Sequence, residues 1–192
     1  MPRQPAKARP DTQGAVEDLI PRPTLLPDED PTTYDHLHQA LLLDLNPATP
    51  YEKAIAENLV TNEWEALRHR RLRDALIRAK ARDVAVGLCS KGKLTELNHW
   101  EQPEEEAWAV GVALIGDEPD ERQDAFAALR AYDIGPDEVM AEAYRLAANA
   151  VEVHEQKLAD LETRRRRLRD DYDRLKSARA RPVEDAEVVR DN

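Results

Sequence analysis

The sequence predicts an all-α protein, with a helical hairpin followed by a long C-terminal coiled-coil helix in an elongated arrangement. Helix-start signals precede stretches in which apolar residues recur every three or four positions. No stretch alternates apolar and polar residues as a strand would. The chain of 192 residues has three tryptophans, five tyrosines, one phenylalanine and only six glycines. These numbers predict a thin core of leucine, alanine and valine.

Residues 1–29 are predicted to form a disordered or extended arm, because they hold six of the 13 prolines and almost no periodic apolar pattern. The stretch "LIPRPTLLP" at 19–27 is an exception, since it places apolar pairs between prolines. Two interpretations stay open for it. It is either an extended segment that lies along the body of the protein or a short linear motif for a partner.

Residues 30–89 are predicted to form a helical hairpin with a basic C-terminal half. Asp30 is a good N-cap residue for a first helix over 31–45. Thr49 and Glu52 have the spacing of a capping box at the start of a second helix, near 50–86. The short "NPATP" link between the two helices predicts that they are antiparallel.

Residues 90–135 are predicted to form an acidic helical middle segment. Positions 101–142 contain 13 acidic residues and two arginines, a net charge of −11. Pro103 and the glutamates after it predict a helix start, with 107–115 as the buried part of that helix. A second short helix fits 119–132. The alternative of a strand at "GVALI" lacks a second strand to pair with.

Residues 136–180 carry the clearest pattern, an apolar repeat of seven residues over about five heptads that is typical of a coiled coil. A disordered tail is predicted at 181–192. The candidate oligomer seam comprises Met140, Tyr144, Ala147, Val151, His154, Leu158, Leu161, Arg165, Leu168, Tyr172 and Leu175.

A second copy of the chain is the partner that we expect at this seam. Helix 50–86 offers a poor match, since its best register turns polar after Leu59. An antiparallel homodimer avoids stacking Arg165 on itself. Arg165 and His154 are expected to set the register of the pair. A histidine pH switch is the alternative role for His154, although the sequence indicates no partner for it.

Two tracts are strongly basic: 68–93 has nine bases and two acids, and 157–181 has ten bases and five acids. We interpret them as faces that match the acidic middle segment, within one chain or between copies. The alternative is a nucleic-acid-associated accessory factor, although the net charge of −11 opposes broad contact with a polyanion. The candidate polyanion contacts would be Arg68, Arg71, Arg78, Arg164 and Arg167.

No motif of an enzyme, a nucleotide-binding loop or a metal site is found in the sequence. His36 and His38 lie on different sides of a helix, and Cys89 is the single cysteine. The alternative to an ordinary cysteine is that Cys89 has a reactive thiol, because nearby cations lower the pKa of a thiol. We expect no cofactor and no metal.

The longest apolar run, 107–116, is too short to span a bilayer, and no signal peptide is seen. A cytoplasmic protein without membrane contact is therefore expected.

The stretch from Glu29 to Arg73 resembles a pattern that recurs in uncharacterised bacterial proteins. The matching features are the "EDPTTY" helix start at 29–34, the "PATPYE" turn at 47–52 and the "WEALRHRRLR" segment at 64–73. The resemblance covers about a quarter of the chain and implies a bacterial helical-hairpin module without a particular activity. We therefore expect a non-enzymatic interaction or scaffold protein, the nucleic-acid factor being the alternative and an enzyme without a recognisable motif the third.

Overall fold

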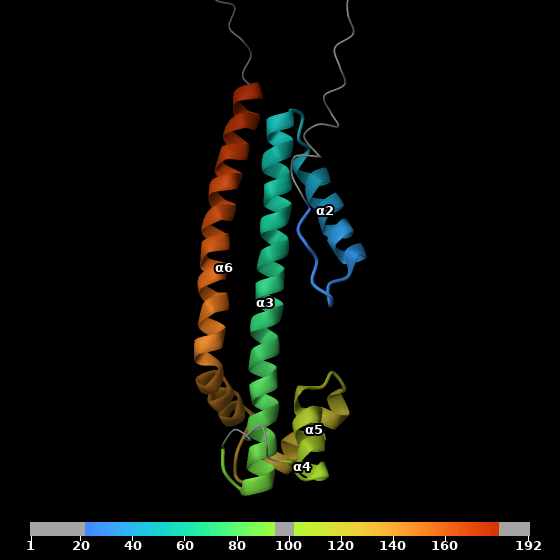
Figure 1. Ribbon diagram of the computed structural model, residues 1–192, viewed down its shortest axis with the longest axis vertical. Helices are drawn as coiled ribbons and strands as arrows, with labels where there is room; N and C mark the ends of the chain where they lie inside the picture. Colours follow the sequence, from blue (N-terminus) through green and yellow to red (C-terminus); the bar gives the residue numbers. More distant parts are fainter. Residues whose placement is uncertain (1–21, 95–101, 181–192) are drawn as a thin grey trace, which may run out of the picture. The chain divides into compact units, whose positions relative to one another are not determined.

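The computed structural model describes residues 22–94 and 102–180, and these residues form five helices and no strand (Figure 1). The helices are α2 (Pro31–Leu45), α3 (Pro50–Lys91), α4 (Glu105–Ile115), α5 (Pro119–Arg130) and α6 (Pro136–Ala180). The all-α prediction is therefore confirmed, together with the long C-terminal helix. The predictions for residues 1–21, which include Leu19 and Ile20, and for the tail at 181–192 lie outside the described residues.

Helix α3 continues beyond its predicted end near residue 86. Gly87 is buried inside the helix, and the helix ends at Lys91. The next residue, Gly92, has a φ of 64°, in the left-handed region that favours glycine after a helix. Gly92 is therefore the residue that ends the helix.

The chain divides into two compact units, and each contains part of both long helices. One unit comprises Met1–Ala66 and Leu161–Asn192, and the other comprises Leu67–Asp160. We call them the terminal unit and the central unit. The boundaries of the predicted segments lie outside the predicted helices, whereas the boundary between the two units runs through α3 and α6.

Both helix starts of the terminal unit have the predicted caps. The Asp30 carboxylate accepts hydrogen bonds from the amides of Thr32 and Thr33, at 3.0 and 3.1 Å. At the start of α3, the Glu52 amide donates to Thr49 Oγ1 at 3.1 Å, and the Thr49 amide donates to Glu52 Oε2 at 3.2 Å. The capping box is thereby confirmed, and it satisfies amides that have no partner within the helix.

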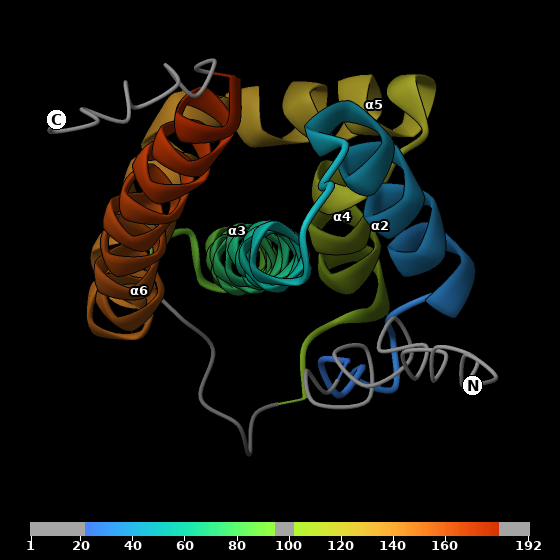
Figure 2. The same ribbon diagram turned by 90° about the horizontal axis from the view of Figure 1, so that it is seen from above.

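Helix α6 holds the turn between α2 and α3. The buried Tyr172 hydroxyl donates to the Leu45 carbonyl oxygen at 2.7 Å. Arg179 contacts the buried Glu52 carboxylate at 3.0 Å. In this unit α2 and α6 lie on two sides of α3 (Figures 1 and 2). The core around Tyr172 therefore draws on all three helices, with Leu45, Ile55, Ala56 and Leu59.

The described end of the N-terminal arm packs on the same unit. Leu25 packs against the cluster of Tyr34, Val60 and Trp64. The buried Glu29 carboxylate accepts from the Leu26 amide at 2.8 Å and from Trp64 Nε1 at 3.3 Å. Within "LIPRPTLLP", residues 22–26 have no regular secondary structure, Leu25 packs on the body and a turn begins at Pro27, while 19–21 lie outside the described residues.

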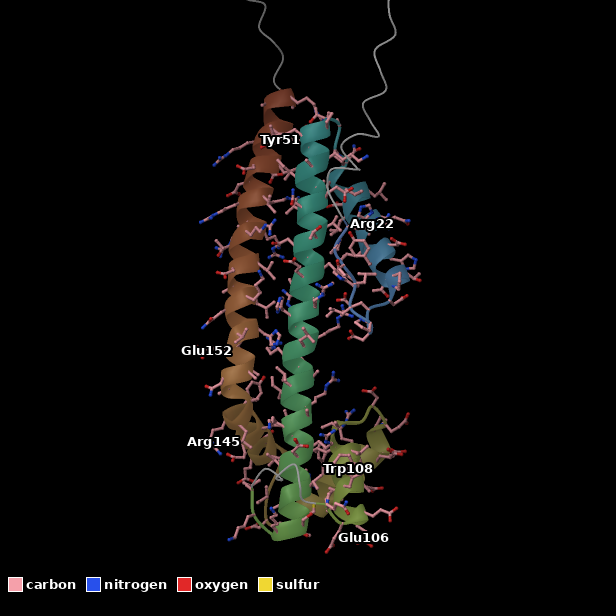
Figure 3. All side chains as sticks on the ribbon, viewed as in Figure 1. Arg22, Tyr51, Glu106, Trp108, Arg145 and Glu152 are labelled. Carbon is pink, nitrogen blue, oxygen red and sulfur yellow. The ribbon has the colours of Figure 1, made fainter. Side chains whose placement is uncertain are left out.

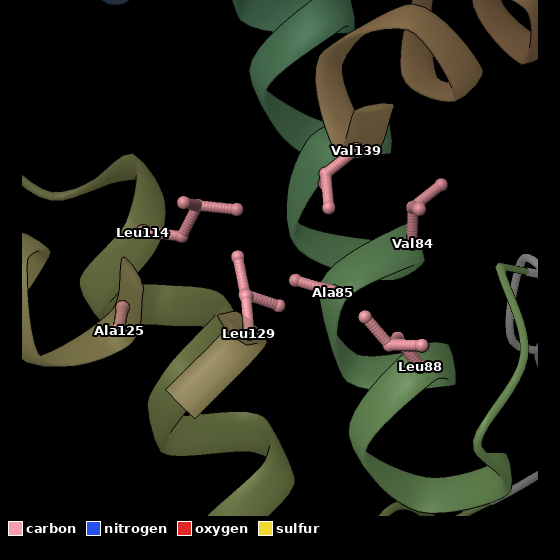
Figure 4. Close-up of a cluster of buried hydrophobic side chains, with 7 residues drawn as sticks. All are labelled: Val84, Ala85, Leu88, Leu114, Ala125, Leu129 and Val139. Carbon is pink, nitrogen blue, oxygen red and sulfur yellow. The ribbon is translucent and has the colours of Figure 1, made fainter. Parts of the chain in front are cut away.

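The central unit has its own apolar core, where α3 meets the two short helices and the start of α6 (Figure 4). The core residues are Val84, Ala85, Leu88, Leu114, Ala125, Leu129 and Val139. Helix α4 approaches α3 closely at Gly111. A Cβ atom at this position would lie 2.9 Å from the Arg82 carbonyl oxygen and would also overlap Val86 Cγ2. Only glycine fits this contact without a shift.

Replacing Gly111 with alanine should push α4 away from α3. We expect Gly111→Ala to lower the free energy of unfolding by about 1–3 kcal/mol, because overpacking against a backbone atom cannot be relieved by a rotamer change. Gly135→Ala is the control, since a Cβ there meets only Glu138 Oε2, at 3.6 Å. Urea denaturation followed by circular dichroism measures both. Equal stability of the two variants would contradict the close contact.

Glu52 should make the stability depend on pH. The Ala48 amide, together with the Thr49 amide and the Arg179 guanidinium, holds the pKa of the Glu52 carboxyl below its ordinary value. A carboxyl with a lowered pKa in the folded state stabilises the fold above its unfolded-state pKa, and this stabilisation is lost as the pH falls through the folded-state pKa. Glu52→Gln should therefore cost about 1–3 kcal/mol at neutral pH and much less in acid. Urea titrations of both chains from pH 7 downward measure this. A cost that is independent of pH would refute it.

Candidate functional site

The central unit carries an apolar groove on the surface of α4 and α5. Its volume is about 550 Å³, and it is lined by Trp108, Ala109, Val110, Val112, Ala113, Glu121, Asp124 and Ala125. Trp108 remains 42% exposed and Val112 45% exposed. Two large apolar side chains therefore remain in contact with water, side by side on one helix.

The groove exists because α4 is apolar on two faces. Ala107, Gly111 and Leu114, spaced by four and three residues, point into the unit and are buried. Trp108 and Val112, spaced by four, lie on a neighbouring face that the chain leaves exposed. The expectation that 107–115 is buried throughout is therefore corrected. A helix of 11 residues has room for an inner and an outer apolar row, and α3 and α5 cover only the inner one.

The Trp108 ring is held in place by a cation from α3. The Arg82 guanidinium carbon lies 4.8 Å from the centre of the ring, a cation–π contact. Arg82 in turn donates two hydrogen bonds to Asp83, at 3.0 and 2.8 Å. Figure 3 labels Trp108 on α4. Trp108 is therefore half-exposed and has a cation packed against its ring.

The side of the groove opposite Trp108 is acidic. Glu121 and Asp124, one helical turn apart on α5, contribute to the lining and are exposed. Residues 102–135 hold nine acidic residues and two arginines, so their net charge is −7. None of these nine carboxylates forms an ion pair within residues 22–94 and 102–180. Arg122 donates to the Gly116 carbonyl oxygen.

The predicted seam of α6 is covered in part by other helices of the same chain: four of its eleven residues are buried, six are half-buried and Tyr144 is exposed. In the terminal unit Leu161 and Tyr172 are buried, and the Asn62 side chain donates to the Leu161 carbonyl oxygen at 3.1 Å. In the central unit Ala147 and Val151 pack against Ile77. The seam was expected to pair with a second copy, because helix 50–86 turns polar after Leu59. In the structure two of those polar residues, Asn62 and His69, form hydrogen bonds to α6.

Tyr144 does not follow the predicted seam. It is 50% exposed, whereas its neighbour Ala143 is fully buried. Val139 is also fully buried, in the core that contains Leu88 and Leu129. Near its start α6 packs against several helices of the central unit, and its buried row shifts by one residue relative to the heptad pattern.

His154 has a partner that the sequence did not indicate. Its Nδ1 atom lies 2.9 Å from Nδ1 of His69 on α3, and the two rings are tilted by 52°. A hydrogen bond between two imidazole nitrogens requires a proton on one and a lone pair on the other. The pair joins α3 to α6 in the central unit. Sequence reasoning missed it because the two residues are 85 positions apart.

The candidate polyanion contacts fall in both units. Arg68, Arg71 and Arg78 belong to the central unit, and Arg164 and Arg167 to the terminal unit. Neighbouring arginines of α6 are paired with carboxylates of α6 or α3. These ion pairs are Arg165–Glu162 at 2.8 Å, Arg165–Glu63 at 3.4 Å, Arg169–Asp173 at 3.6 Å and Arg174–Asp171 at 3.6 Å.

Cys89 is partly buried beside the core of the central unit. Burial raises the pKa of its thiol, so less thiolate forms than at an ordinary cysteine. This direction of the pKa does not favour the reactive-thiol alternative. Among the described residues, no three His, Cys, Asp or Glu side chains come together as a metal site. No described helix combines the length and the apolar character needed to span a bilayer.

The chain alone should sediment as a monomer, because the buried residues of the seam already pack against helices of the same chain. Sedimentation equilibrium at micromolar concentrations should give a mass of 21.8 kDa. A dimer would contradict this expectation and would show that two copies associate through surfaces that the chain leaves exposed. Leu161→Asp in that dimer would then tell whether the α6 seam takes part.

Comparison with known proteins gives no relative from which a role could be carried over. No protein-family model, no curated protein and no solved structure matches the chain.

Proposed function

We propose that this chain is a non-enzymatic interaction protein whose α4–α5 groove binds an amphipathic helix of a different protein. The single observation that carries the proposal is the apolar groove around Trp108. Tryptophan is enriched among the few residues that dominate binding energy in protein interfaces, and Trp108 is 42% exposed in this groove. Three alanines, Ala109, Ala113 and Ala125, are among the lining residues, and their small side chains leave room for those of an approaching helix.

A different protein fits this groove better than a second copy of the chain. Two α4–α5 hairpins that met through this face would bring together two surfaces of net charge −7 each. Like charges at an interface oppose association. The buried residues of the α6 seam also pack against helices of the same chain, so they are not open to a second copy.

The two other functions considered for the sequence have less support. A nucleic acid would meet the unpaired carboxylates of the α4–α5 hairpin, which repel phosphate. The half-buried groups that would be candidates for catalysis, Cys89 and the His69–His154 pair, do not lie in the groove. The bacterial and cytoplasmic setting expected from the composition and the single cysteine is part of the same proposal.

Placing a charge in the groove should abolish partner binding. The chain is purified with its partner from the host, the partner is identified, and binding of the recombinant partner is measured by calorimetry. Val112→Asp should weaken binding at least about tenfold, because a buried charge without a partner is costly at the centre of an interface. Val153→Asp is the matched control, since Val153 is also an exposed valine on a helix of the central unit, 63% exposed and outside the groove.

The two valine variants separate a loss of binding from a loss of folding. Both should keep the helical circular dichroism and the melting temperature of the parent chain, because both sites are exposed. Equal affinity of the two variants for the identified partner would exclude the groove as the binding site.

A further inference from the structure

We infer that the helix bound in this groove is cationic, with lysine or arginine beside its apolar stripe. The inference rests on the proposed function and adds the chemistry of the partner. It comes from the unequal sides of the groove. One side is apolar, with Trp108 and Val112 of α4, and the other carries the carboxylates of Glu121 and Asp124 of α5. A helix that binds here would place apolar side chains against α4 and hydrogen-bond donors against the carboxylates of α5.

The carboxylates on the rim have no cation of their own. Two other carboxylates beside apolar contacts have a cation partner: Glu63 pairs with Arg165 at 3.4 Å and Glu52 with Arg179 at 3.0 Å. Glu121 and Asp124 form no such pair within the described residues. A neutral helix in the groove would remove water from both carboxylates without replacing its hydrogen bonds, whereas an ammonium or guanidinium group would replace them.

The nearest cation, Arg82, is already engaged. Its guanidinium lies over the Trp108 ring and donates twice to Asp83. The two arginines of the hairpin do not line the groove, and Arg122 donates to the Gly116 carbonyl oxygen. Among the described residues, no cation is therefore paired with Glu121 or Asp124, and a basic partner would supply one.

Spacing sets where the cations of the partner should stand. Glu121 and Asp124 are three residues apart on α5, so their carboxylates lie on one face about one turn apart. A partner helix with basic residues three or four positions apart matches this spacing. Because charges are screened over about 8 Å at physiological salt, only residues beside the rim contribute, and the net charge of the rest of the partner matters little.

Two synthetic helices test the inference with the full-length chain. Both have about 18 residues and the same leucine stripe, and they carry either lysine or glutamate at the positions that flank the stripe. Calorimetry at about 0.1 M salt should show the lysine peptide binding at least about tenfold more tightly than the glutamate peptide. The double variant Glu121→Lys/Asp124→Lys should reverse this preference. The control Glu152→Lys/Glu155→Lys makes the same charge change on α6, outside the groove, and should leave the preference unchanged.

The outcomes separate the inference from the function on which it rests. Equal binding of both peptides, lost in Val112→Asp, would overturn the cationic partner and leave the groove as a binding site. A preference for lysine that the α6 control removes equally would overturn the assignment to Glu121 and Asp124. If neither peptide binds and the identified partner also ignores Val112→Asp, the proposed function fails together with the inference.

Discussion

Helix α3 cannot bury its apolar residues against a single neighbour, and the rest of the structure follows from that constraint. Its apolar positions drift around the helix, so different partners cover different stretches. In the terminal unit, Ile55 and Leu59 pack with α2 and α6. In the central unit, Val84 and Leu88 pack with α4, α5 and the start of α6. Each unit therefore has its own core, although both long helices continue from one unit into the other.

Polar groups on the long helices join the helices instead of interrupting their packing. Asn62 donates to the Leu161 carbonyl oxygen, His69 contacts His154, and the Tyr172 hydroxyl reaches the carbonyl oxygen of Leu45. A buried polar group without a partner costs more than a hydrogen bond contributes. The hydrogen bonds of Asn62 and His69 therefore favour this packing of α6 on α3, although the buried Asn62 Oδ1 has no hydrogen-bond partner among the described residues. These hydrogen bonds help to explain how α6 pairs with a helix whose heptad pattern is poor.

The groove has a similar origin, because α4 also has more apolar surface than its neighbouring helices cover. α4 is short and apolar on two faces, and Gly111 lets its inner face approach α3 closely. The outer face, with Trp108 and Val112, remains exposed beside an α5 helix whose carboxylates are unpaired. A partner helix with apolar and basic residues would complete both sides.

The sequence by itself determined the local structure, since local structure depends on neighbours in the chain. The caps at Asp30 and at Thr49 with Glu52, the prolines at helix starts and the heptad repeat of α6 act within one or two turns. The partner of α6 depends on residues such as His69 and His154, which are 85 positions apart, and only the tertiary structure decided it. The same holds for Trp108: the pattern of α4 shows two apolar faces, but which face is covered depends on how closely α3 can approach, and Gly111 sets that distance.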